Sequence, residues 1–234
     1  MGFLDSLFGR KDPQQPVAGD SVSLLMRDTL FGDMPLDRWK AEGTAEQQPP
    51  WRQFAQAREH LKHGEKEPAI ARWREVIMEP GLEPRLYLQA WHFLRSQGEM
   101  PPPDLAQRVL GVIVEVMLPD GLDIVAAYSD HSARYYNHRN GSVIWERPDA
   151  SLDGAIDALH SAGARVVAQI GPSNEPQHPP PPPLGQTLLS FLTPGGLHYG
   201  QGGINTFSND PKGGPVLKAA FELMQALMAK TGKA

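Results

Sequence analysis

The chain has 234 residues, which is long enough for one large domain or two small ones. It contains 22 Lys and Arg residues against 27 Asp and Glu residues, so its formal net charge is −5. A chain of this charge has no basic field to neutralise phosphates, and we expect no nucleic-acid partner. The absence of cysteine excludes disulfides, thiol nucleophiles and cysteine-ligated metal sites.

The first eleven residues form a short amphipathic segment. Four apolar side chains fall on one side of two helical turns, and two basic residues follow them. A stripe of this kind docks into a groove of a partner protein or lies weakly on a membrane surface. Packing of the segment on its own domain is the alternative. The predicted contact residues are Phe3, Leu4, Leu7 and Phe8.

Residues 1–50 are predicted to form this amphipathic helix and a loosely ordered arm. From residue 12 onward the arm is rich in Pro, Gln, Gly and Asp, with one apolar stretch at residues 22–26 and another at Leu30-Phe31, which indicates a loosely held arm with a single short helix. No stretch is long and apolar enough to span a bilayer, and no leader pattern opens the chain. We therefore expect a cytoplasmic protein, and the Arg- and Ala-leaning composition favours a bacterial source.

Residues 51–103 read as a helical region. Apolar residues recur every three or four positions in three segments, which begin at Trp51, near Pro68 and at Pro84. Glycines or prolines follow each segment, as is typical of helix ends.

The turn between the first two of these helices resembles that of a tetratricopeptide repeat. It reads Gly64-Glu-Lys-Glu-Pro-Ala-Ile70, an aromatic residue follows at Trp73, and Pro80 closes the second helix. The resemblance covers about residues 51–97 and implies a helical hairpin of the kind used as a peptide-binding scaffold. The matched positions are packing positions in that family, so they imply no binding residue.

Residues 104–234 are predicted to form an α+β domain. Short β-branched and aromatic runs separated by turn residues predict an antiparallel meander, and Asn140-Gly141 is the sharpest turn signal. The predicted strands of the meander are 111–118, 122–128, 133–138 and 142–146.

The remainder of this domain mixes helices and strands. We predict a helix from Ser151 to Gly163, a strand at 165–170, strands at 187–193 and 197–199, and a final helix from Pro215 to about Lys230. A proline-rich insertion at 171–185 is expected to be an extended spacer. With the helices on one face of the sheet, the order resembles profilin-like and roadblock-like scaffolds in outline.

The segment 193–214 is the richest in glycine and is the candidate for a small-molecule site. Glycines let a backbone approach a ligand closely, although tight turns and bulges are the favoured explanation of them. The segment lacks the Gly-Lys-Ser/Thr of a phosphate loop. Its candidate ligand contacts are His198, Tyr199, Asn205 and Asp210.

No catalytic residue, metal site or cofactor is predicted. The eight histidines show no zinc-ligand spacing, and no Gly-x-Ser-x-Gly motif occurs. The sequence therefore predicts a non-enzymatic adaptor that binds a protein partner within a larger cytosolic assembly. The alternative is a small-ligand sensor or an enzyme that uses residues 193–214.

Overall fold

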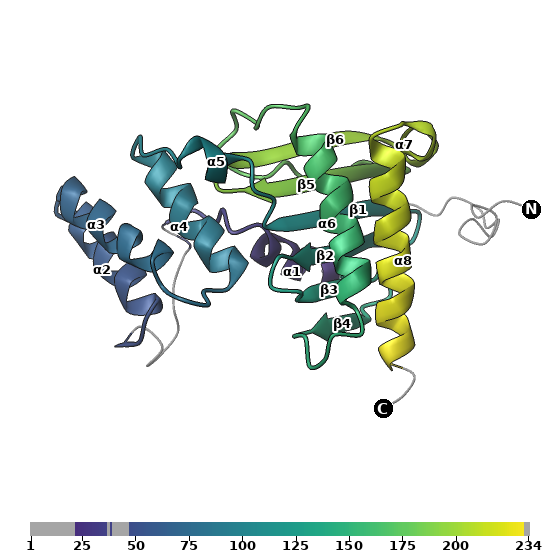
Figure 1. Cartoon of the computed structure of the whole chain (residues 1–234), viewed down its shortest axis with the longest axis horizontal. Coiled ribbons are helices and arrows are strands. Elements are labelled where there is room, and N and C mark those ends of the chain that lie inside the picture. Colours follow the sequence, from purple (N-terminus) through teal and green to yellow (C-terminus); the bar gives the residue numbers. More distant parts are fainter. Residues whose placement is uncertain (1–21, 37, 39–46, 232–234) are drawn as a thin grey trace, which may run out of the picture.

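Six strands form one antiparallel sheet in the order β4-β3-β2-β1-β5-β6 (Figure 1). The structure is a computed structural model, and it describes residues 22–36, 38 and 47–231. The predicted α+β class is confirmed, and so is the meander of the first four strands. The strands are β1 (Gly111–Leu118), β2 (Gly121–Tyr128), β3 (Ala133–Tyr136), β4 (Ser142–Trp145), β5 (Gln186–Thr193) and β6 (Gly196–Gly203).

The helices lie before, within and after this sheet in the sequence. The three predicted in the helical region are present, and Gly64, Gly81 and Gly98 follow them with φ of +75°, +69° and +90°, a conformation that favours glycine. The helices are α1 (Val22–Arg27), the 3-10 turn η2 (Asp28–Leu30), α2 (Trp51–Lys62), α3 (Lys66–Ile77), α4 (Pro84–Ser96), α5 (Pro103–Ala106), α6 (Asp153–Val167), α7 (Ile204–Asn209) and α8 (Gly213–Thr231).

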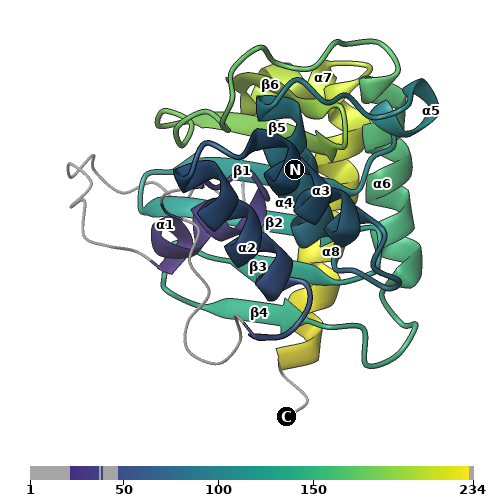
Figure 2. The same cartoon turned by 90° about the vertical axis from the view of Figure 1, so that its left-hand side faces the viewer.

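Strand alternation divides the sheet into two buried faces. On β1, Val112 and Val114 point toward α6 and α8, whereas Ile113 points to the opposite face. Helices α6 and α8 lie side by side over the first face, and α1 lies on the other (Figures 1 and 2).

The second face corrects the expectation that helices cover only one side of the sheet. Leu30 and Phe31, at the end of the arm's short helical stretch, are 0% and 3% exposed and pack on the sheet beside Leu88 of α4. Leu30 and Phe31 of the arm are therefore part of the core, whereas Leu24 and Leu25 of α1 are 39% and 62% exposed. The sequence did not reveal this packing because the arm's few apolar residues have no periodicity.

The strand predicted at residues 165–170 is wrong, because α6 continues to Val167. Gly163 lies inside the helix, where a Cβ atom would come within 2.9 Å of Cγ2 of Val112 and 3.0 Å of Cδ1 of Phe191. The glycine thus lets α6 approach the sheet closely, and Val166 and Val167 are buried on the same side of the helix.

The end of the chain is more regular than expected. Strand β6 runs to Gly203 instead of ending near Tyr199, and the short helix α7 follows it without any sequence prediction. The final helix begins at Gly213, two residues before the predicted start.

The helical region has a core of its own. Trp73 of α3 is fully buried among Phe54 of α2 and Phe93 of α4. Helix α4 also contacts the sheet domain, because Arg95 donates a hydrogen bond to the carbonyl of Pro194. The resemblance to a tetratricopeptide repeat stays a prediction.

Candidate functional site

An apolar groove of about 430 Å³ opens between the sheet and α8, at the end where β1 finishes and β2 begins. Ile204 and Ser208 of α7 line one end of the groove. The charged groups at its margin are Asp123, Lys218 and Glu222. Its apolar lining includes Val114, Val116, Leu118, Leu217, Ala220 and Met224.

The groove exists because α8 is held against α6 and not against the whole width of the sheet. Leu223 and Leu227 of α8 are fully buried in the core shared with α6. Leu217 and Met224 belong to the same wide apolar stripe but are only partly buried. The apolar stripe of α8 is therefore broader than its packing against α6 and the sheet requires. The part of the stripe that is not fully buried, which includes Leu217 and Met224, lines the groove.

The ring of Phe207 in α7 packs against three glycines of the segment beside the groove. Its ring lies within 3.4–3.8 Å of the positions that Cβ atoms would take at Gly200 and Gly202, and a Cβ at Gly213 would come within 2.5 Å of Cδ1. A Cβ at Gly200 or Gly202 would make ordinary van der Waals contact with the ring, so of these three glycines only Gly213 has to lack a side chain to make room for it.

A polar cluster stands at the β2 end of the groove. The carboxylate of Asp123 accepts hydrogen bonds from the hydroxyl of Tyr135 at 3.1 Å and the backbone N–H of His138 at 2.8 Å. Nδ1 of His138 lies 2.7 Å from the same carboxylate. Burial, and next the charge of Asp123, raise the pKa of Tyr135 above its ordinary value, so the phenol stays protonated.

This cluster suits a binding surface better than a catalytic one. Both oxygens of Asp123 already have donors within the protein, and a protonated Tyr135 is no nucleophile. The remaining lining supplies mainly carbon atoms. The groove can therefore hold apolar side chains or an apolar molecule and fix their orientation at its charged margin.

The structure separates the predicted contacts of the glycine-rich segment. His198 is 1% exposed and its Nδ1 lies 3.0 Å from the carbonyl of Ile170, whereas Tyr199 follows it on the opposite face of β6 and is 37% exposed. Burial lowers the pKa of His198, which keeps the imidazole neutral. The histidine fastens the chain after α6 to β6.

The other two candidates lie around α7. Asn205 is exposed, and its carbonyl accepts a hydrogen bond from Asn209. Asp210 accepts the backbone N–H groups of Lys212 and Gly213, at 2.9 and 2.6 Å, and these bonds lower the pKa of its carboxyl. Asp210 thus organises the start of α8. The four residues form no common site, and ligand binding in this segment stays a prediction.

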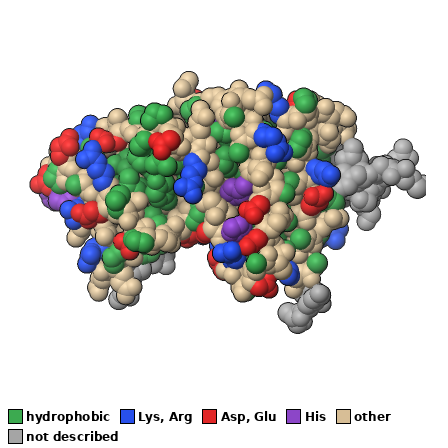
Figure 3. Space-filling view, in the orientation of Figure 1, with side chains coloured by type: hydrophobic (Ala, Val, Ile, Leu, Met, Phe, Trp, Pro, Cys, Tyr) green, Lys and Arg blue, Asp and Glu red, His purple; other side chains and the backbone are tan. Residues whose placement is uncertain are grey.

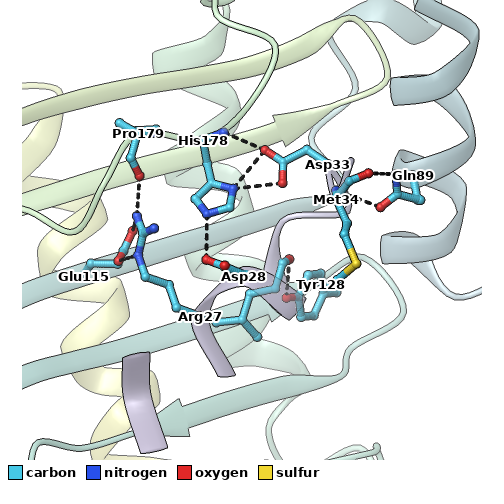
Figure 4. Close-up of polar contacts among 10 residues, drawn as sticks. Arg27, Asp28, Asp33, Met34, Gln89, Glu115, Tyr128, His178 and Pro179 are labelled. Carbon is cyan, nitrogen blue, oxygen red and sulfur yellow. Dashed lines mark hydrogen bonds and ion pairs between the residues drawn. The ribbon is translucent and has the colours of Figure 1, made fainter. Parts of the chain in front are cut away.

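A second polar cluster is buried on the opposite face of the sheet (Figure 4). The guanidinium of Arg27 donates to both carboxylate oxygens of Glu115, at 2.5 and 3.0 Å, and also to the carbonyl of Pro179 at 2.7 Å. The side chains of Arg27 and Glu115 are 4% and 0% exposed. Burial raises the pKa of Glu115, and Arg27 opposes that shift.

His178 extends this cluster toward the arm. It donates its backbone N–H to Asp33, places Nδ1 2.8 Å from the same carboxylate, and places Nε2 3.2 Å from Asp28. Its ring stacks on Phe31 with centroids 3.9 Å apart. The proline-rich segment is therefore held against the arm and is not a free spacer. Since each charged group here has a partner, the cluster fastens the arm to the sheet.

Two kinds of site are absent from the described residues, 22–36, 38 and 47–231. Within these ranges no group of three or more histidines, aspartates or glutamates could hold a metal ion. Among the described helices none is long and apolar enough to cross a membrane. Phe3, Leu4, Leu7 and Phe8, the predicted partner or membrane contacts, lie outside the described residues.

Comparisons of the chain with protein-family models, with curated proteins and with solved structures find no match. The functional interpretation consequently depends on the groove itself. The sequence patterns placed the residues that line the groove in strands and in the final helix. They did not distinguish these residues from those that are buried in the core. The one signal in the sequence was the unusual width of the apolar stripe on the final helix.

Proposed function

We propose that this protein is a non-enzymatic binding subunit of a larger assembly and that its groove receives apolar side chains of a protein partner. The observation that carries the proposal is the groove of about 430 Å³ along α8. A helix whose apolar residues recur at three and four positions presents side chains that fit such a groove. Lys218 and Glu222 stand on the exposed side of α8, where they can select the direction of that helix.

The helical region supports an adaptor role by offering another surface. Hydrophobic side chains gather on its visible face around α4, while charged side chains are scattered over the surface around them (Figure 3). Exposed apolar areas of this kind mark protein interaction sites. The predicted hairpin resemblance points to the same use.

Co-purification with a groove variant tests the proposal. Val116 is partly buried and lines the groove, so Val116→Trp fills the groove from the sheet side. Met78→Trp is the matched control, because Met78 follows α3 in the helical region, is 79% exposed and does not line the groove. We expect a stoichiometric protein to co-purify from the source lysate with the wild type and the control but not with Val116→Trp. A partner retained equally by all three would overturn the proposal, provided that urea unfolding gives the variants the same midpoint.

A small apolar molecule is the second candidate occupant. The groove volume falls in the range of about 300–1,000 Å³ typical of small-ligand pockets. A ligand at 100 times its Kd adds about 2.7 kcal/mol to the free energy of unfolding. A fatty acid that raises the unfolding temperature of the wild type but not of Val116→Trp would support this candidate. No shift with any member of an acyl-chain series would reject it.

A further inference from the structure

We propose that the groove along α8 is occupied in the free protein by residues 3–8 of the same chain. The inference rests on the proposed function of the groove and names its resident occupant. These residues carry the apolar stripe formed by Phe3, Leu4, Leu7 and Phe8.

The described part of the arm begins at the same end of the sheet as the groove. Ser23, at the start of α1, donates a hydrogen bond of 3.1 Å to the carbonyl of Asn137. The next residue, His138, is hydrogen-bonded to Asp123, which lines the groove. The first described residues of the arm thus lie at the end of the sheet where the groove opens, on its opposite face.

The intervening chain is long enough to pass around this end of the sheet. Residues 9–21 separate the stripe from Val22, and at about 3.3 Å per residue an extended link of that length spans roughly 40 Å. A linker of this length holds a segment at an effective concentration on the order of millimolar. A stripe with only modest intrinsic affinity would therefore fill the groove most of the time.

The chemistry of the two surfaces matches. The segment offers four large apolar side chains, and the groove offers mostly carbon atoms from β1, β2 and α8. Arg10 and Lys11 follow the stripe, and two of the three charged groups at the groove margin, Asp123 and Glu222, are acidic. A partner helix must then displace the segment, so the segment acts as a competitor that weakens partner binding.

The absence of cysteine gives a direct test with the full-length chain. Ser208→Cys places a thiol at the exposed margin of the groove, and Met78→Cys places a control thiol directly after the last residue of α3. Each is combined with the stripe variant Phe3→Ser/Leu4→Ser/Leu7→Ser/Phe8→Ser or with the native stripe. We expect the stripe variant to raise the rate of maleimide alkylation about fivefold or more at Ser208→Cys and to leave the rate at Met78→Cys unchanged. Equal rates at Ser208→Cys, or a matching rise at Met78→Cys, overturn the inference.

A crosslink distinguishes the chain's own segment from that of a second copy. On oxidation, Phe8→Cys combined with Gln225→Cys should give a monomeric disulfide whose yield does not depend on protein concentration. Disulfide-linked dimers instead would overturn the inference. Neither the alkylation rates nor the crosslink depends on a partner protein. The co-purification experiment with Val116→Trp therefore tests the proposed function independently of this inference.

Discussion

The buried ion pair between Arg27 and Glu115 predicts a distinctive pattern of stabilities. Glu115→Leu removes the negative charge and leaves Arg27 buried with the carbonyl of Pro179 as its remaining hydrogen-bond acceptor. Arg27→Met leaves Glu115, which is fully buried, without its donor. Breaking a buried pair by removing one member typically costs about 3–5 kcal/mol, because the remaining charge loses its compensation. We expect each single substitution to lower the free energy of unfolding by that amount.

Replacing both members should be far less harmful than the sum of the single changes. In Arg27→Met/Glu115→Leu no buried charge remains, and the carbonyl of Pro179 loses one donor, which costs about 1–3 kcal/mol. The coupling energy of the double-mutant cycle should therefore exceed about 2 kcal/mol. Urea unfolding followed by circular dichroism and tryptophan fluorescence measures all four proteins at pH 7.

Two results would refute this reasoning about the arm. One is a single substitution that costs under about 1 kcal/mol, which would mean that the cluster is hydrated and the arm is not held on the sheet. The other is additivity of the two single costs, which would mean that Arg27 and Glu115 act independently.

Three further predictions concern pH, α6 and α8. Burial lowers the pKa of His92, in α4, from 6.5 to about 4. Its contribution to the free energy of unfolding is therefore complete above pH 6.5 and is lost as the pH falls to 4, by up to about 3 kcal/mol. His92→Gln should flatten this part of the pH profile of urea unfolding. Gly163→Ala should cost about 1–3 kcal/mol because its Cβ would meet Val112, whereas Gly154→Ala in the same helix, with nothing within 4 Å, should be neutral or stabilising in the same assay. Asp210→Ala should lower the midpoint of urea unfolding, because two backbone N–H groups at the start of α8 lose their acceptor, and an unchanged midpoint would contradict that role.

Turn residues and β-branched runs in the sequence were sufficient to predict the meander of β1 to β4. Asn140 adopts a φ of +63° in the β3–β4 hairpin, as its Asn-Gly turn predicted, and the β-branched runs became the paired strands. The strand predicted at 165–170 was wrong because two adjacent valines favour a strand locally, whereas in the structure they belong to α6 and are buried in the core under that helix.

The covering of the second sheet face could not be predicted from sequence. Arg27 and Glu115 are 88 residues apart, and His178 lies 145 residues from Asp33, so neither pairing leaves a local pattern. The groove was missed for a related reason. Val116 and Met224 look like core residues in the sequence, and only the placement of α8 against α6 leaves them partly open.

Methyl NMR of the full-length stripe variant, titrated with a peptide of native residues 1–11, tests most directly whether the groove binds an amphipathic segment. The methyl groups of Val116, Leu217 and Met224 report on the groove, and those of Met78 and Met100, which are 79% and 67% exposed, report on surfaces away from it. We expect saturable shifts at the groove methyls alone. Shifts confined to Met78 and Met100, or no shifts at all, would contradict the assignment of the groove as a binding site.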